Sequence, residues 1–196
     1  MKKVFAFDFD GTITTKDTLL EFIKYAKGRA ALYRALLLFS PLLVLMKLRL
    51  YSNHKTKEKV FTYLFGGMDT EAFDMLCRSF ANDNRQLLRP KAMTYIYNVL
   101  ENPDAEVVII SASIENWVSP FFADKPQIKV LGTQVETKDS RLTGKLLTEN
   151  CYGKEKVNRL LRIYPNRQTY HLTAFGDSRG DKELLAFADE AHYKTF

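Results

Sequence analysis

A short apolar strand that ends in two carboxylates and a glycine opens the chain, and it constrains the fold more than any other stretch. Residues 4–7 read Val-Phe-Ala-Phe, which is typical of a fully buried strand. Asp8 and Asp10 follow, and side chains two positions apart in an extended segment point the same way. Two like charges in one small site are costly unless a cation or a proton lies between them. Gly11 allows a tight turn and a close approach of backbone to ligand. Alone, these residues would also fit a helix cap and an ordinary turn.

The remaining pattern divides the chain into a helical stretch and an alternation of strands and helices. Residues 14–90 carry apolar residues at helical spacing only. Further strands are predicted at 107–110, 128–131, 170–175 and 192–195, helices at 92–101, 114–122, 154–164 and 181–188, and a hairpin at 133–147 with its turn near Asp139-Ser140. Alternation of this kind implies an α/β fold with a parallel sheet covered by helices on both faces. We expect a core of residues 1–13 and 91–196, and an inserted all-helical cap of residues 14–90.

Composition indicates a globular intracellular protein. The 196 residues fit one domain, or one domain with an insertion, and 46% of them are hydrophobic while 27% are charged. Cys77 and Cys151 lie far apart and lack the spacing of a metal site, so we expect free thiols in a reducing compartment. Asp8 and Asp10 interrupt any apolar stretch that would make a signal peptide, so we expect a cytoplasmic protein.

The positive charge is concentrated in the predicted cap. Residues 24–59 contain nine Lys and Arg residues and one Glu, a charge of +8 against +6 for the whole chain, which leaves −2 elsewhere. Within this segment, residues 35–46 are twelve residues without a charge, fewer than the roughly 20 needed to cross a bilayer. Pro41 should break or kink the helix there. The segment is either a helix pair buried in a small bundle or a surface that dips into the membrane interface. We expect no nucleic-acid partner, because few aromatic residues suited to base stacking accompany the charges.

Polar side chains follow two more of the predicted buried strands. Ser111 comes after the strand at 107–110, and Asp177 with Asp181 comes after the strand at 170–175. The carboxyl ends of parallel strands meet at one edge of the sheet, so these groups should lie near Asp8 and Asp10. Clustered oxygen ligands without His or Cys suit Mg²⁺, and helix starts with a Ser hydroxyl suit a phosphate. The sequence thus predicts Mg²⁺-assisted phosphoryl chemistry, although Ser111 and Asp181 would separately fit helix-terminal roles.

The ordered motifs resemble those of the haloacid dehalogenase superfamily of phosphohydrolases, which implies a Rossmann-like sheet core. Residues 8–12, Asp-Phe-Asp-Gly-Thr, match the first motif, Ser111 matches the second, and residues 176–181 match the fourth. The third motif is a lysine at a helix start, for which Lys154 and Lys156 both qualify. We prefer Lys156, because its distance to Leu160 fits the spacing of the family.

The resemblance implies roles for these residues. Asp8 would be the nucleophile that forms an aspartyl-phosphate, and Asp10 the general acid and then the base. Mg²⁺ would be held by Asp8, Asp10 and Asp177, with Asp181 close by. The phosphate would be held by Gly11, Thr12, Ser111, Ala112 and Lys156.

The helical insertion after the first motif is similar to the cap of phosphoserine phosphatase relatives, the branch called subfamily IB. The apolar, basic character of the cap and the segment Cys151-Tyr152-Gly153 resemble the bacterial phosphatidylglycerophosphatase C branch. This resemblance implies a lipid phosphate as substrate, such as phosphatidylglycerophosphate, with peripheral contact to the cytosolic face of the membrane. The alternatives are a soluble phosphatase of phosphoserine-like or sugar phosphates, and a non-enzymatic adaptor with the same fold.

Overall fold

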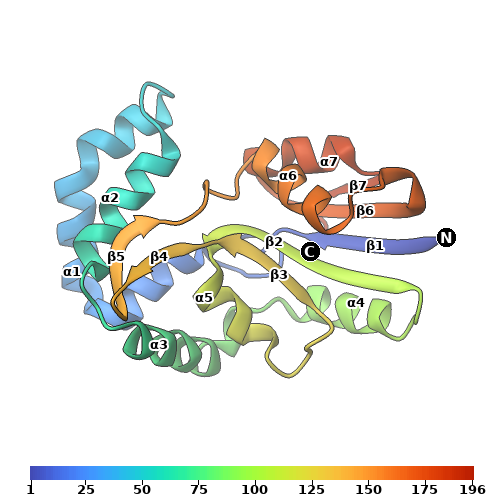
Figure 1. Ribbon diagram of the computed structural model, residues 1–196, viewed down its shortest axis with the longest axis horizontal. Coiled ribbons are helices and arrows are strands. Elements are labelled where there is room, and N and C mark those ends of the chain that lie inside the picture. The colour runs from blue at the N-terminus through green and yellow to red at the C-terminus, as the bar shows by residue number, and fades with distance from the viewer.

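A five-stranded parallel sheet forms the centre of the protein in the computed structural model, which describes residues 1–196 (Figure 1). The strand order is β3-β2-β1-β6-β7. The bounds are β1 (Lys2–Phe7), β2 (Ala105–Ile114), β3 (Lys129–Thr133), β6 (Tyr170–Gly176) and β7 (Glu190–Tyr193). β1 pairs with β2 on one side and β6 on the other, so Val4, Ala6 and Phe7 are fully buried. This central position explains why the first strand is apolar throughout.

Helices cover both faces of the sheet, as the alternation predicted. One face packs against α4 (Pro90–Leu100), α5 (Glu115–Val118) and the 3₁₀ turn η2 (Ser119–Phe122). The other face packs against α6 (Lys154–Ile163) and α7 (Lys182–Phe187). Alternate residues of β1 serve the two layers, with Phe7 in the first core cluster and Val4 and Ala6 in the second. The predicted fold class is confirmed.

The insertion between β1 and β2 consists of α1 (Thr18–Lys47), α2 (Asn53–Phe65), α3 (Thr70–Asp83) and the short 3₁₀ turn Arg85–Leu87, followed by α4. Aromatic rings join it to the core: Phe22 of α1 stacks on Trp117 of α5 with ring centroids 4.8 Å apart, and Phe80 of α3 meets Phe121 edge-on. The hairpin β4 (Val135–Lys138) and β5 (Arg141–Leu146) turns at Asp139-Ser140 as predicted and packs against α2. The expected boundaries of the cap stay a prediction.

Helix α1 breaks at Gly28 and not at Pro41, which corrects the expected position of the kink. Gly28 has φ 81° and ψ 164°, outside the helical region, whereas the helix runs through Pro41. The proline leaves the carbonyl of Leu37 without its usual backbone donor, and the hydroxyl of Ser40 donates to that carbonyl instead at 2.8 Å. This replacement bond removes part of the cost of a proline inside a helix.

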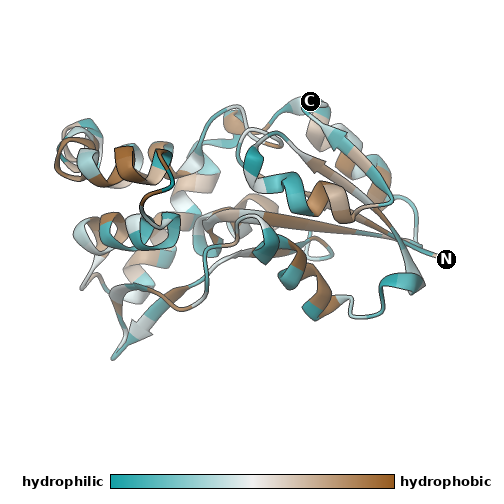
Figure 2. Ribbon diagram, turned by 90° about the horizontal axis from the view of Figure 1, so that it is seen from above, coloured by the Kyte–Doolittle hydropathy of each residue, from teal (hydrophilic) through white to brown (hydrophobic).

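The apolar segment of α1 is mostly exposed, so it is not the core of a helix bundle. By length and composition, α1 is long and apolar enough to cross a bilayer. Its most apolar stretch of 18 residues has a mean hydropathy of 1.6, but only 11% of that stretch is buried. Brown segments, which mark apolar residues, occur in the helical insertion as well as in the sheet (Figure 2). Five side chains that point outward are Leu37, Leu38, Val44, Leu45 and Leu48. A core helix would bury such residues.

Candidate active site

Three carboxylates from two neighbouring strands converge at the carboxyl edge of the sheet. Asp8 follows β1, and its N–H donates to the carbonyl of Phe175 in β6 at 2.9 Å, which holds the two strand ends together. Asp177 and Asp181 follow β6, and one oxygen from each of the three carboxylates lies within 4.8 Å of the other two. The structure thus brings Asp8, Asp177 and Asp181 together at the carboxyl edge of the sheet, as the sequence predicts.

The residues present fit a divalent cation. Oδ1 of Asp177 is buried and has no hydrogen-bond partner, although buried polar atoms are normally paired. Gly11 leaves room for this carboxylate: a Cβ on Gly11, whose φ is 82°, would lie 2.4 Å from Oδ2 of Asp177. A hard cation with oxygen ligands would satisfy the orphan oxygen and relieve the repulsion among the three acids. Burial, the nearby Asp181 carboxylate and the nearby Asp10 carboxylate all raise the pKa of Asp177.

Lys156 is the cation at the centre of this cluster. It lies at the start of α6, is 2% exposed, and its Nζ donates to Oδ1 of Asp8 at 2.5 Å and to Oδ1 of Asp181 at 2.6 Å. Burial alone would lower the pKa of Lys156, but the two carboxylates raise it above its ordinary value. Burial raises the pKa of Asp8, which the charge of Lys156 opposes. Lys154 is exposed to solvent and makes none of these contacts.

Asp10 is held by hydroxyl groups from both sides of the site. Its Oδ1 accepts from the N–H of Thr18 at 2.7 Å and from the Thr18 hydroxyl at 2.6 Å. Its Oδ2 accepts from the hydroxyl of Ser113 at 2.6 Å and from that of Ser111 at 3.4 Å. Asp10 thus connects the end of β1, the end of β2 and the first residue of α1, and its orientation depends on all three.

The other expected phosphate-binding residues lie at the same edge. The hydroxyl of Thr12 donates to Oδ2 of Asp8 at 3.4 Å, and the N–H of Gly11 donates to the Thr14 hydroxyl at 3.3 Å. Ser111 also accepts the N–H of Ser113 at 3.0 Å, in the last part of β2, where the pairing with β3 shifts register between Ile110 and Ile114. Ala112 lines the cavity beside it. The structure brings the expected residues together; their roles stay predictions.

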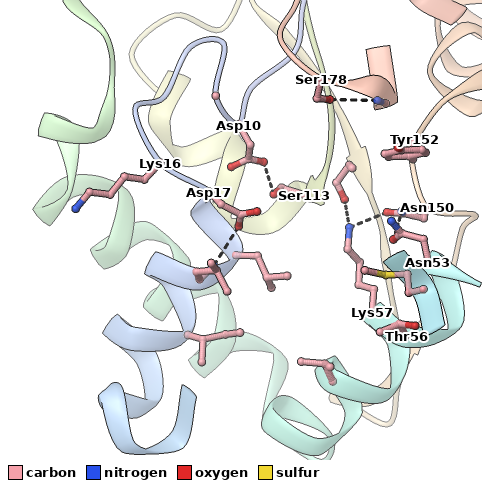
Figure 3. A pocket seen from close by; sticks show the side chains of 18 of the residues that line it. Asp10, Lys16, Asp17, Asn53, Thr56, Lys57, Ser113, Asn150, Tyr152 and Ser178 are labelled. Carbon is pink, nitrogen blue, oxygen red and sulfur yellow. Dashed lines mark hydrogen bonds between the residues drawn. The ribbon is translucent and has the colours of Figure 1, made fainter. Parts of the chain in front are cut away.

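Sequence reasoning missed Lys57, Ser113 and Asn150. Lys57 reaches from α2 to the sheet edge, where its Nζ donates to the Ala112 carbonyl at 2.5 Å and to Oδ1 of Asn150 at 2.7 Å (Figure 3). Burial lowers the pKa of Lys57 to about 8, and the carboxylates of Asp10 and Asp17 oppose this shift. The position of Ser113 could have indicated its role, because side chains two positions apart in a strand, such as those of Ser111 and Ser113, point the same way. The contact of Lys57 spans 55 residues and has no local pattern.

A cavity of about 560 Å³ connects the site with the helical insertion. Its polar end includes Asp8, Asp10, Lys156 and Asp177, and Figure 3 shows Asp10, Ser113 and Lys57 around the same space. Its other end is apolar and is formed by α1 and α2, through residues Leu19, Leu20, Ile23, Leu32, Leu36, Leu43, Met46 and Val60. The cavity therefore has a polar end at the sheet edge and an apolar end in the helical insertion.

The parallel sheet with helices on both faces makes this an α/β protein, with acids and a buried lysine at the carboxyl edge of the sheet. Its family follows from comparison with known proteins. The chain belongs to the haloacid dehalogenase-like hydrolases, whose family model matches residues 5–186. The expected superfamily and the expected enzyme class, a hydrolase, are confirmed.

The chain is also similar to individual known proteins. Protein CicA of Caulobacter vibrioides is 33% identical over 193 residues, which cover 97% of this chain and 85% of CicA. A protein of unknown function from Bordetella pertussis Tohama I has a TM-score of 0.79 at 18% identity, over 95% of this chain and 87% of that one. Phosphoserine phosphatase from T. onnurineus has a TM-score of 0.63 at 21% identity, over 98% and 84% of the two chains. The two structures show likeness of fold.

Proposed function

We propose that the protein is a Mg²⁺-dependent phosphatase that hydrolyses a phosphate monoester through an aspartyl-phosphate on Asp8. The observation that carries this proposal is the convergence of Asp8, Asp177 and Asp181. One oxygen of Asp177 is buried without a partner, and Lys156 pairs with the other two acids. Asp8, Asp177 and the backbone carbonyl of Asp10 would hold Mg²⁺, with Asp181 beside them. When bound, the ion supplies charge neutralisation for the phosphoryl oxygens.

The chain's own residues would divide the reaction into two displacements. The carboxylate of Asp8 attacks phosphorus, the ester P–O bond breaks, and Asp10 gives its proton to the departing oxygen. Asp10, now ionised, takes a proton from water, whose oxygen attacks the same phosphorus. The acyl-phosphate bond breaks, inorganic phosphate leaves, and Asp8 is again a carboxylate. Lys156, 2.5 Å from Asp8, holds the nucleophile in place, and its charge opposes the rise in the pKa of Asp8 that burial causes.

Turnover of an aryl phosphate with Mg²⁺ tests this chemistry. Asp8→Asn removes the nucleophilic oxygen, so kcat should fall by about three orders of magnitude or more. Burial raises the pKa of the Asp8 carboxyl, which means that its charged form is unfavourable in this site. A neutral amide there should therefore leave the protein folded, which circular dichroism can verify. A folded Asp8→Asn variant with near wild-type turnover would refute the assignment of the nucleophile. An inactive wild-type protein would favour the non-enzymatic adaptor, against which the complete set of acids argues.

We further propose that the substrate is a lipid phosphate, such as phosphatidylglycerophosphate, met at the cytosolic face of the membrane. The apolar end of the cavity, which α1 and α2 form, would bind the part of an acyl chain nearest the headgroup. The second half of α1 has two apolar faces: Leu32, Leu36 and Leu43 line the cavity, whereas Leu37 and Val44 point outward. The surrounding segment of residues 24–59 carries +8, which favours anionic lipid.

A soluble phosphatase is the second proposal that an observation supports. The chain shares its fold with phosphoserine phosphatases, and the cavity lining includes the exposed charged residues Lys16 and Asp17. In that case the apolar face of α1 would be covered by another protein surface. Flotation with liposomes, with and without anionic lipid, distinguishes the two proposals when combined with a screen of phosphorylated metabolites and short-chain lipid phosphates. No flotation, together with efficient turnover of soluble monophosphates, would overturn the lipid proposal.

A further inference from the structure

A second cavity lies beside the first, between the end of α1 and the segment that follows β6. Its volume is about 550 Å³, and it shares Met46, Asn53 and Tyr152 with the cavity of the active site. Four of the nine residues that line it are basic, namely Lys47, Arg49, Arg179 and Lys182. Two come from the end of α1 and two from the segment that carries Asp177 and Asp181. The cavity is thus adjacent to the site of hydrolysis and separate from its acids.

The positive charge of this second cavity is not neutralised within the protein. None of the four basic side chains forms an ion pair or donates a hydrogen bond, and Glu183 is the one acidic residue in the lining. Other basic residues of the chain are paired: Arg159 lies 2.7 Å from Glu155, and Arg167 lies 2.6 Å from Asp189. All four basic residues are exposed to solvent, so together they form a positively charged surface that attracts anions.

Arg49 occupies a backbone position that ordinarily favours glycine. Its φ is 63°, in the left-handed region. The N–H of Arg49 donates to the Met46 carbonyl at 3.0 Å, and the N–H of Leu50 donates to the Leu45 carbonyl at 2.8 Å. These two bonds form a Schellman motif, in which the residue at the position of Arg49 is usually Gly. An arginine therefore costs folding free energy here, and Arg49 is one of the residues that line the second cavity.

We propose that this second cavity binds a phosphate diester of a lipid headgroup, next to the site that hydrolyses the monoester. The inference rests on the proposed lipid phosphatase function. Arg and Lys recognise phosphate oxygens by charge-assisted hydrogen bonds, and a diester anion needs no metal to be held. The cavity also borders apolar surface, because Leu48 and Leu50 on either side of Arg49 are 62% and 72% exposed. An anion that is attached to acyl chains fits this combination.

The diester has two sources that share this chemistry. It is either the second phosphate of the substrate molecule itself, or the headgroup of a neighbouring anionic lipid. Two soluble short-chain lipids separate these sources: a phosphatidic acid, which has only the monoester, and a phosphatidylglycerophosphate, which has the monoester and a diester. If the substrate's own diester binds, kcat/KM should be about ten-fold higher for the second lipid. If a neighbouring lipid binds, the two values should agree, and binding to phosphatidylglycerol vesicles should depend on the cavity.

Arg49→Gly is the decisive variant, because its effects on folding and on binding have opposite signs. Glycine relieves the left-handed backbone, so the thermal midpoint should stay equal or rise. The loss of the guanidinium should abolish most of the preference for the diester-bearing lipid, or weaken vesicle binding about ten-fold. Lys47→Gln should act in the same direction. Arg78→Gln and Lys91→Gln, on exposed and unpaired residues of α3 and α4, are the matched controls.

Failure of this proposal differs from failure of the proposed function. If neither lipid is hydrolysed, the lipid phosphatase proposal fails; titration of wild-type protein with glycerophosphoglycerol, a soluble diester, then decides on the cavity alone. Binding that Arg49→Gly removes would support the cavity as an anion site. If Arg49→Gly and Lys47→Gln leave lipid preference, vesicle binding and diester binding at the level of the Arg78→Gln control, the second cavity is not an anion site.

Discussion

Asp10 and Thr18 form two hydrogen bonds to each other, one from the Thr18 N–H at 2.7 Å and one from its hydroxyl at 2.6 Å, both to Oδ1 of Asp10. Asp10 is the proposed general acid, and Thr18 is the first residue of α1. The Thr18 hydroxyl also accepts from Nε1 of Trp117 at 3.3 Å. The proposed proton donor is therefore oriented by the beginning of the helical insertion, not by the sheet alone.

Thr18→Val should reduce catalysis in a manner that depends on the leaving group. Valine has a similar shape but removes the hydroxyl bond to the carboxylate, so kcat for an alkyl phosphate should fall roughly ten-fold. An aryl phosphate releases a weaker base that needs less protonation, so its kcat should fall less. Thr18→Ser keeps the hydroxyl and should behave as the wild type. Equal losses for both substrates would show that Thr18 does not act through the acid.

The sequence predicts the acidic residues of the site but not the contacts that the helical insertion makes with them. Asp8, Asp177 and Asp181 were predicted to meet because residues that follow parallel strands share one edge, whatever the intervening chain does. The sequence predicts a helical stretch that contains Thr18 and Lys57, but it does not indicate that either side chain reaches the sheet edge. Their contacts with the sheet edge depend on how α1 and α2 pack as whole helices, which apolar periodicity does not determine.

The fold shows the same division between local and long-range information. The hairpin turn at Asp139-Ser140 is predicted because Asp and Ser are common turn residues, and the structure has both at positive φ, 48° and 59°. The kink of α1 was misplaced, because a Pro signal is strong in sequence, whereas the Ser40 bond that compensates Pro41 and the non-helical turn at Gly28 become visible only in the structure. The exposure of the apolar face of α1 likewise depends on what packs beside it.

Gly11→Ala should weaken Mg²⁺ binding without removing any ligand. The new Cβ would lie 2.4 Å from Oδ2 of Asp177 and displace that carboxylate, so the Mg²⁺ concentration for half-maximal activity should rise about 10- to 100-fold. Gly28→Ala is the matched control, because Gly28 has nearly the same φ, 81° against 82°, and no atom within 4 Å of the new Cβ. The control should lose stability by about 1–3 kcal/mol, because its ψ of 164° places it in a region that only glycine readily adopts, and it should keep its Mg²⁺ dependence. Similar Mg²⁺ dependence in the two variants would contradict a cation at Asp177.

Lys57 should give the enzyme a pH limb near 8. Burial lowers the pKa of Lys57 to about 8, so the ammonium, which attracts an anionic substrate, is present below this pH and lost above it. The ammonium has three donors, of which Ala112 and Asn150 use two, so one remains for substrate. We expect kcat/KM to decline above pH 8, with a slope of about ten-fold per pH unit.

Two variants and a stability measurement isolate this lysine. In Lys57→Arg the decline should move to higher pH, and in Lys57→Gln kcat/KM should be low and flat across that range. The folded pKa lies below the ordinary value of 10.5, so the unfolded chain binds the extra proton between about pH 8 and 10.5. The free energy of unfolding should therefore gain a contribution as pH rises through that window, and Lys57→Gln should lack it. A decline near pH 8 that persists in Lys57→Arg would assign it to another group.

The outward face of α1 provides the most direct test of membrane contact. Leu37 and Val44 are 78% and 57% exposed and lie seven residues apart, hence on one side of the helix. Leu37→Glu combined with Val44→Glu replaces apolar surface by charge that anionic lipid repels, so binding to phosphatidylglycerol vesicles should weaken at least about ten-fold. Because both side chains are exposed, the free energy of unfolding should change by no more than about 0.5 kcal/mol each. Met75→Glu, at a 51% exposed position on α3, is the control and should bind vesicles as the wild type does. If the double variant binds as tightly as the Met75→Glu control, α1 does not face the lipid. The exposed leucines of α1 would then be better explained by contact with another protein surface.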